Sequence, residues 1–458
     1  MRLDSAAGRW LVAAMVLGTG MAFLDGSIVN LALPAIDGDL DAGVAGLQWT
    51  VNAYTLTLAA LILVGGSLGD RWGRRRVFLV GVVWFAVASL ACALAPTIEV
   101  LVAARGLQGV GGALLTPGSL AIISASIHPD DRGRAIGLWS GLAGVTTALG
   151  PLVGGTLVDA VGWRSVFWIN LPLAAVVVWV TWRHVPESTG AQERLDVEGS
   201  LLTVGTLAFL TYGLVQQEWV PSLAGLALLV AFVVHQWRAP HALVPLSLFA
   251  DRVFTAANIC TFAIYGALSG SMFLLVLQLQ YVAGYSPLEA GLATLPLTVL
   301  MLLFSSRAGA LGQRIGPRVP MTVGPLLSAA GLLLYLRIGA GASFWLDVLP
   351  GAVLMGLGLT LLVAPLTTAV LAAAPDDQAG IASGINNAVS RTAGLLAVAA
   401  IPPLAGIAGP DFASPDVFGP GFRVGTWICV GLLVVAAGCA AALVHGRSAD
   451  PDRAPTSA

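Results

Sequence analysis

Two long apolar runs are joined by the stretch Gly66-Ser67-Leu68-Gly69-Asp70-Arg71-Trp72-Gly73-Arg74-Arg75-Arg76. A related stretch joins two further apolar runs, and it reads Gly309-Ala310-Leu311-Gly312-Gln313-Arg314-Ile315-Gly316-Pro317-Arg318. Glycines, the leucine and two arginines match in register at an offset of 243 residues. A repeat at this spacing indicates that the chain consists of two related halves.

The rest of the composition indicates a membrane protein. Of the 458 residues, 57% are hydrophobic and 10% are charged, with a mean hydropathy of +0.87. Globular chains carry about 25% charged residues, so this chain is too poor in charge to cover a surface that faces water. A membrane-spanning helix needs roughly 20 apolar residues, and we predict an all-α membrane protein with fourteen such helices. The predicted spans are 10–33, 47–68, 77–95, 98–122, 133–158, 166–185, 197–217, 221–237, 253–280, 287–308, 319–338, 345–371, 379–406 and 423–444.

The repeat assigns these spans to four segments. The first six spans correspond to the last six, so the two spans between them are an insert, which gives a 6+2+6 arrangement. We predict a six-helix bundle over 1–190, a two-helix insert over 191–245, a second six-helix bundle over 246–446 and a tail over 447–458. Arginines are concentrated in the loops on one side, and the other side holds only Arg164, Arg337 and Arg423. This bias predicts that both termini, and the tail, are cytoplasmic, and the acidic segment 35–46 is predicted to be an outer loop.

Several function classes are not supported by the sequence. The net charge of −2 and the lack of a basic domain argue against a nucleic-acid partner. The four cysteines show no CxxC spacing, and the five histidines lie in loops or at helix ends, so no metal site is predicted. No GxxxxGK[ST] sequence for binding ATP is present. We therefore predict no enzyme activity and no cofactor, with an ion gradient as the energy source.

One carboxylate, Asp25, is predicted deep within the hydrocarbon, where an unpaired charge costs several kcal/mol. At about 1.5 Å of rise per residue, Asp25 and Arg105 lie at similar depths, about 10–12 Å below the outer surface. We predict a direct or water-bridged pair at which a proton binds and leaves. The alternatives are that Asp25 is a structural residue satisfied by backbone or water, and that Arg105 only anchors the first helix through backbone carbonyls.

The charged loop at 66–76 has two interpretations. Its arginines fit the cytoplasmic bias alone, or the loop is a cytoplasmic gate formed by Gly66, Asp70, Arg71, Gly73, Arg74 and Arg75. In the gate, Asp70 would lie at the N-terminus of the helix at 379–406, where unpaired N–H groups favour an anion. Gln313 occupies the matching position of the repeat and carries no charge, so such a latch would be asymmetric.

The fifth span is rich in glycine, at Gly144, Gly150, Gly154 and Gly155, and includes Pro151. Glycines allow close approach of helices, and Pro151 removes one helix hydrogen bond. These residues serve either tight packing alone or a seal between the two halves.

A substrate cavity is predicted between the halves, with an adaptable aromatic and methionine-rich wall suited to apolar or amphipathic molecules. The candidate lining residues are Asn30, Asn52, Tyr54, Gln108, Tyr265, Met272, Phe273, Gln278 and Arg391. Arg391 has no intramembrane acid in its own half. It faces water, bonds carbonyls or nearby asparagines, or attracts an anionic group of a substrate, and we favour a structural or hydrated role.

Nearly the whole chain resembles the fourteen-helix drug:proton antiporters of the major facilitator superfamily. The segment Leu24–Pro34 resembles the first-helix signature of that branch, and the 66–76 loop resembles motif A. Residues 105–112 resemble motif B, and the glycines at 141–155 resemble motif C, which is associated with export. Residues 163–172 are also similar to that family. Gly26 departs from the family, which usually has a larger residue there.

The resemblance implies a monomeric proton-coupled antiporter in the bacterial inner membrane that exports drugs, antibiotics or related natural products. Its partners would be a small-molecule substrate, protons and the lipid bilayer. Two alternatives remain: an uptake symporter on the same fold, and a non-transporting membrane receptor. The motif C stretch argues against the symporter, and the buried Asp25–Arg105 pair would have no role in the receptor.

Overall fold

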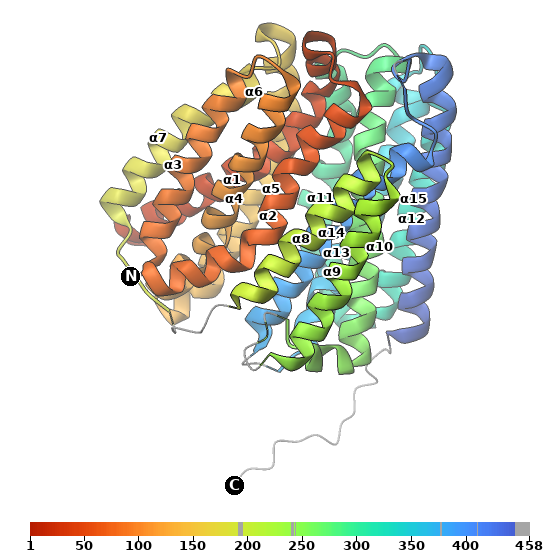
Figure 1. Ribbon diagram of the computed structural model, residues 1–458. Helices are drawn as coiled ribbons and strands as arrows, with labels where there is room; N and C mark the ends of the chain where they lie inside the picture. The colour runs from red at the N-terminus through yellow and green to blue at the C-terminus, as the bar shows by residue number, and fades with distance from the viewer. Residues whose placement is uncertain (191–195, 240–241, 243, 376–377, 410, 445–458) are drawn as a thin grey trace.

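The computed structural model describes residues 1–190, 196–239, 242, 244–375, 378–409 and 411–444, and these residues form helices and their connections, without a β-strand (Figure 1). The predicted tail at 447–458 lies outside the described residues. The helices of the first half are α1 (Ala6–Leu40), α2 (Gly43–Trp72), α3 (Arg74–Ala93), α4 (Ile98–Ser126), α5 (Pro129–Val161), α6 (Ser165–Trp168) and α7 (Asn170–His184). Two helices follow, α8 (Val197–Val215) and α9 (Trp219–Arg238). The second half contains η1 (Leu246–Ala250), α10 (Arg252–Leu277), η2 (Gln278–Val282), α11 (Pro287–Ile315), α12 (Arg318–Tyr335), η3 (Phe344–Val348), α13 (Leu349–Ala372), α14 (Ala379–Leu404) and α15 (Pro415–Leu443).

Twelve helices within the described residues are long and apolar enough to cross a membrane. Helices α5 and α14 are not among these twelve, although they contain 33 and 26 residues. The structure thus supports an all-helical fold with about twelve membrane-spanning helices.

Two predicted boundaries are corrected. The first helix continues to Leu40, so most of the acidic segment predicted as an outer loop is helical. The chain turns after Leu40, where Asp37 Oδ1 accepts a hydrogen bond of 2.9 Å from the Gly43 amide. The sixth predicted span is divided at Ile169 into α6 and α7.

Local sequence explains where several helices begin and end. Ser5 caps α1, because its Oγ accepts a hydrogen bond from the Gly8 amide at 3.1 Å. Gly73 separates α2 from α3 with a φ of 106°, a backbone conformation that residues with a side chain rarely adopt. The turn between α2 and α3 thus depends on glycine.

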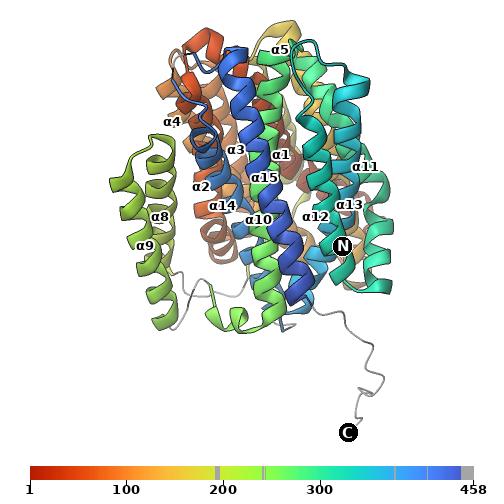
Figure 2. The same cartoon turned by 90° about the vertical axis from the view of Figure 1, so that its right-hand side faces the viewer.

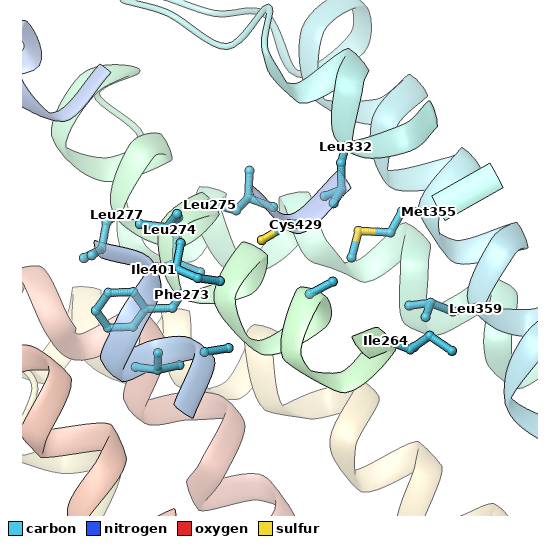
Figure 3. Packing of buried hydrophobic residues seen from close by; sticks show 14 of the residues in the cluster. Ile264, Phe273, Leu274, Leu275, Leu277, Leu332, Met355, Leu359, Ile401 and Cys429 are labelled. Atoms are coloured by element: carbon cyan, nitrogen blue, oxygen red, sulfur yellow. The ribbon is translucent and has the colours of Figure 1, made fainter. Parts of the chain in front are cut away.

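The two halves lie side by side and meet along two helix pairs, α5 with α11 and α2 with α14 (Figure 1). The α8–α9 hairpin stands beside this assembly, where α8 packs against α2 and α14 (Figure 2). In the second half, buried side chains of α10, α12, α13 and α15 form a common core that includes Ile264, Leu332, Met355 and Cys429 (Figure 3).

We name the two ends of the assembly the basic end and the acidic end, after the charged residues found there. The basic end holds Met1 and residues 70–76, where α2 meets α3, and the N-terminal amine of Met1 donates to the Ser126 carbonyl there at 2.7 Å. The acidic end holds the last turn of α1, with Asp37 and Asp39, and the ends of α5 and α14.

Candidate functional site

A cavity of about 600 Å³ lies between the halves. Its walls come from α1 and α2 on one side and from α10 and α14 on the other, and α4 contributes one residue, Arg105. Ligand pockets typically measure about 300–1,000 Å³, so the cavity has room for a drug-sized molecule. Gly26 lies on its α1 wall with no atom within 4 Å of the position that a Cβ would occupy.

Six of the predicted lining residues border this cavity: Asn30, Asn52, Tyr54, Tyr265, Met272 and Arg391. The prediction was wrong for three others. Phe273 is 2% exposed and packs into the core of the second half (Figure 3). Gln278 is buried and donates to the Ile338 carbonyl at 2.8 Å, and Gln108 belongs to the buried network around Asp25.

Asp25 is buried at the centre of the first half and accepts three hydrogen bonds. Its Oδ2 accepts from Arg105 Nη1 at 2.5 Å, in an ion pair whose side chains are 2% and 0% exposed. Its Oδ1 accepts from Gln108 Nε2 at 2.8 Å and from Asn170 Nδ2 at 3.0 Å. All three partners are donors, which is the arrangement that an ionised carboxylate requires when it is buried.

Arg105 connects this network to the cavity. Its Nε donates to the Thr50 carbonyl at 3.0 Å, and its guanidinium carbon lies 4.4 Å from the centre of the Tyr54 ring. Arg105 also borders the cavity, whereas Asp25 does not. The carbonyl that Arg105 binds belongs to α2 and not to the first helix, as the alternative had it, and the same guanidinium also forms the ion pair with Asp25 on α1.

The sequence analysis did not identify Asn170 and placed Gln108 in the wrong site. Both amides also donate to a shared partner, Ser89 Oγ, at 3.2 Å from Asn170 and 2.7 Å from Gln108. A signal for Gln108 was present: it follows Arg105 by three residues and therefore shares its helix face. A buried amide such as Asn170 in an apolar helix also requires a polar partner.

At the basic end, the end of α2 and the start of α3 contact the segment that follows α7; the predicted 66–76 loop is helical except at Gly73. Asp70 accepts hydrogen bonds from Arg74 Nε and pairs with Arg74 Nη2, both at 2.7 Å. The Arg75 amide donates to Glu187 Oε1 at 3.0 Å, and the Arg75 guanidinium donates to the Val185 carbonyl at 3.1 Å. These contacts anchor the chain just before the chain leaves the first half.

The predicted contact of Asp70 would be made at the N-terminus of α14, which borders residues outside those described. Among the described residues, the Asp70 side chain pairs with Arg74, and the Asp70 carbonyl accepts from the Gly190 amide at 3.0 Å. Arg71 is exposed. Gly66 lies against Pro117, and a Cβ added at Gly66 would lie 3.6 Å from the Cβ of Pro117.

The glycines of α5 pack against α1. A Cβ at Gly154 would lie 2.8 Å from a side-chain carbon of Ile28, and a Cβ at Gly150 would overlap the side chain of Ser27. Gly144 lies in a part of α5 whose side-chain positions are outside those described. Close approach of the two helices thus requires glycine at two of these positions.

The same helix also contacts the second half. A Cβ at Gly155 would lie 2.6 Å from Leu288 Cα, and a Cβ at Gly291 would overlap the Pro151 carbonyl. Helices α5 and α11 therefore meet backbone to backbone at the acidic end, with glycines on both sides of the contact.

Hydrogen bonds between the halves reinforce this end. Gln48 Nε2 donates to the Val398 carbonyl at 2.7 Å, and the Tyr281 hydroxyl donates to Asp37 Oδ2 at 2.9 Å. The Leu288 amide donates to Asp159 Oδ2 at 3.2 Å. Within the described ranges, every hydrogen bond between the halves lies at the acidic end, and we infer that the cavity is closed there and reached from the basic end.

Within the part of the chain that the structure describes, no group of three or more metal-ligating side chains is found.

The sequence matches the profile of the Major Facilitator Superfamily over residues 15–398 and 257–458. Similar proteins include the multidrug resistance protein Stp of Mycobacterium tuberculosis, which is 40% identical over 388 residues, 81% of this chain and 71% of that protein. The tetracenomycin C resistance and export protein of Streptomyces glaucescens is 36% identical over 399 residues, 85% of this chain and 74% of that protein.

Solved structures share the fold at low sequence identity. A transporter of the POT family matches with a TM-score of 0.70 and 15% identity, covering 94% of this chain and 97% of that one. A D-xylose–proton symporter matches with a TM-score of 0.69 and 16% identity, covering 95% of this chain and 98% of that one.

Proposed function

Since the chain belongs to the Major Facilitator Superfamily, we propose that it is a proton-coupled antiporter that exports amphipathic drugs, antibiotics or related natural products from the cytoplasm. The observation that carries the proposal is the position of Arg105, which borders the cavity and holds the buried carboxylate of Asp25. Relatives named for drug resistance and antibiotic export support the cargo class.

We propose a topology of fourteen membrane helices in a 6+2+6 arrangement. The twelve apolar helices, together with α5 and α14, give this number, if α6 and α7 cross as one helix, and the α8–α9 hairpin is the insert. The bundles would span 1–190 and 246–446, with 191–245 between them. We propose from the arginine bias that the basic end and both termini face the cytoplasm. We further propose that the transporting unit is a monomer in a bacterial inner membrane.

The cycle we propose exchanges a proton for cargo by opening one end at a time. With the acidic end closed, cargo enters from the cytoplasm, and Asp25 is ionised and held by its three donors. Opening the acidic end requires α5 and α11 to part at Gly155 and Gly291. In that state we propose that Asp70 leaves Arg74 and caps α14, which closes the cytoplasmic end.

Everted membrane vesicles test the proposal. An imposed proton gradient should drive uptake of an exported compound, and addition of that compound should in turn dissipate the gradient. Asp25→Asn should abolish both, because the amide cannot carry the exchanged proton. The protein level is measured in parallel, because the change leaves the buried Arg105 without its counter-ion.

The matched control is Asp4→Asn, the same change at a carboxylate that is 81% exposed at the basic end. Transport by Asp4→Asn at the wild-type rate is expected. Full proton-driven transport by Asp25→Asn would refute Asp25 as the coupling site.

A further inference from the structure

Arg391 on α14 is a cation without an anionic partner. Within the described residues it has no hydrogen bond and no ion pair, and its contact is with an aromatic ring. Its guanidinium carbon lies 5.8 Å from the centre of the Phe23 ring, so the side chain extends from the second half toward α1 in the first half. A contact at that distance leaves the guanidinium donors free for a ligand.

The charges around the cavity are unbalanced. The described lining residues include Arg105 and Arg391 but no aspartate or glutamate. Asp25 neutralises Arg105 in their ion pair, whereas nothing described neutralises Arg391. The cavity therefore presents a net positive charge to whatever enters it, and this charge attracts anions and repels cations.

A second unsatisfied group borders the same cavity. Asn52 on α2 is fully buried, and both its Nδ2 and its Oδ1 lack a hydrogen-bond partner among the described residues. Tyr54 and Tyr265, one from each half, both lie within electrostatic range of Arg391. A buried polar group without a partner is costly, so a ligand that accepts from Asn52 restores a bond that the empty cavity lacks.

We propose that Arg391 and Asn52 form a subsite for the anionic group of an amphipathic aromatic substrate, such as a carboxylate, a sulfonate or an ionised phenol. The proposal rests on the export function proposed above and narrows its cargo class to organic anions. Water hydrates the guanidinium while the cavity is empty, and the anion replaces that water with a charge-assisted hydrogen bond. The apolar part of the molecule packs between Phe23 and Met272.

Two fluorescent probes that share one ring system test this charge preference: anilinonaphthalenesulfonate, which is anionic, and phenylnaphthylamine, which lacks the sulfonate. Binding is measured to the purified full chain in nanodiscs of uncharged lipid, with empty nanodiscs as the blank. The wild-type protein should bind the sulfonate more tightly than the amine. Arg391→Gln should weaken sulfonate binding by about tenfold or more, the factor for a lost charge-assisted hydrogen bond, and should leave amine binding unchanged.

Arg337→Gln is the matched control, because Arg337 is 58% exposed at the acidic end and pairs with Asp347; both probes should bind it as they bind the wild type. Arg391→Lys should retain part of the preference, since it keeps the charge. If Arg391→Gln does not fold, displacement from the wild type decides: naphthalenesulfonate should displace the anionic probe, and naphthylmethylammonium should not. Equal losses for both probes, or displacement by the cation, would overturn the subsite.

This binding experiment separates the two proposals. An Arg391-dependent preference for the sulfonate, without proton exchange in vesicles, would sustain the anion subsite and refute antiport. Proton exchange in vesicles, together with sulfonate binding that is unchanged in Arg391→Gln, would sustain antiport and refute the subsite.

Discussion

Replacement of Gly155 by alanine should shift the protein out of the conformation described above. The added Cβ would lie 2.6 Å from Leu288 Cα and 2.8 Å from the Pro287 carbonyl oxygen. Carbon atoms in contact prefer a separation of about 3.5–4.0 Å. Both obstructing atoms are backbone, so no rotamer change relieves the clash, and α5 and α11 must separate by about 1 Å.

The energetic effect follows from overpacking. Insertion of one methyl group into a close-packed contact costs about 1–3 kcal/mol. If the α5–α11 contact is present only when the acidic end is closed, this cost applies to one conformation and not to the other. The equilibrium should then shift toward the state open at the acidic end by about 5–150-fold.

Labelling of a single cysteine in the cavity measures this shift. Ser390, which borders the cavity, is replaced by cysteine in a background in which the half-buried Cys439 is alanine. A membrane-impermeant maleimide is applied to right-side-out vesicles, so that it reaches the cavity only through the acidic end. The labelling rate should rise in Gly155→Ala, and in Gly291→Ala, whose Cβ meets the Pro151 carbonyl from the other side of the same contact.

Gly137→Ala provides the control, because Gly137 lies on the same helix with nothing within 4 Å of its Cβ position. Both variants gain about 1 kcal/mol of helix propensity. This gain applies equally to the two conformations, because α5 is helical in both, so it does not shift the equilibrium between them. Labelling of Gly155→Ala at the rate of Gly137→Ala, in protein of normal amount, would refute the assignment of this contact as the closure of the acidic end.

Two further predictions concern the charged groups. Arg105→Lys should retain only part of the export activity, because a single ammonium cannot reach Asp25, Gln108 and the Thr50 carbonyl together as the guanidinium does. Arg337→Lys is the control. Wild-type activity of Arg105→Lys in everted vesicles would contradict the role assigned to the several donors of the guanidinium. Asp70→Asn should slow transport without changing which compounds are exported, because Asp70 is remote from the cavity lining. Its pair with Arg74 is partly exposed, so folding stability should change by no more than about 1 kcal/mol; a changed spectrum of compounds in a resistance assay would count against a gating role.

The predicted pair of Asp25 and Arg105 is present, with a contact of 2.5 Å. The depth estimate behind it counted from a first span that ended too early, since α1 continues to Leu40. The prediction succeeded because a buried acid and a buried base within one bundle stabilise each other. Depth alone does not say which helix faces which. The contribution of Asn170 depends on how α7 packs beside α1 and α3, and this arrangement is a property of the tertiary fold.

The errors in the cavity have a different cause. Helix α10 is apolar on all sides, so hydrophobicity does not indicate which face borders the cavity. Tyr265 and Met272 border it, whereas Phe273, the next residue, points into the core. Gln278 begins a π-helical turn, which changes the angular position of the residues that follow. Rotation about the helix axis was thus the quantity that the sequence did not supply.

In the proposed cycle, Arg105 connects two separate sites, the cavity for the cargo and the buried carboxylate for the proton. Asp25 is 1% exposed and does not border the cavity, and Arg105 is the only charged donor among its three described partners. In the proposed cycle, a proton on Asp25 removes the charge that holds Arg105, so the guanidinium, which already borders the cavity, becomes a second uncompensated cation beside Arg391. An organic anion bound there would compensate both, so protonation of Asp25 and the charge of the cargo are linked through one side chain, and linkage between two binding events is necessarily reciprocal. The Arg105→Lys variant also tests this linkage. A side chain that cannot hold Asp25 and the Thr50 carbonyl together should loosen the coupling between protonation of Asp25 and cargo binding, while each of these two events still occurs.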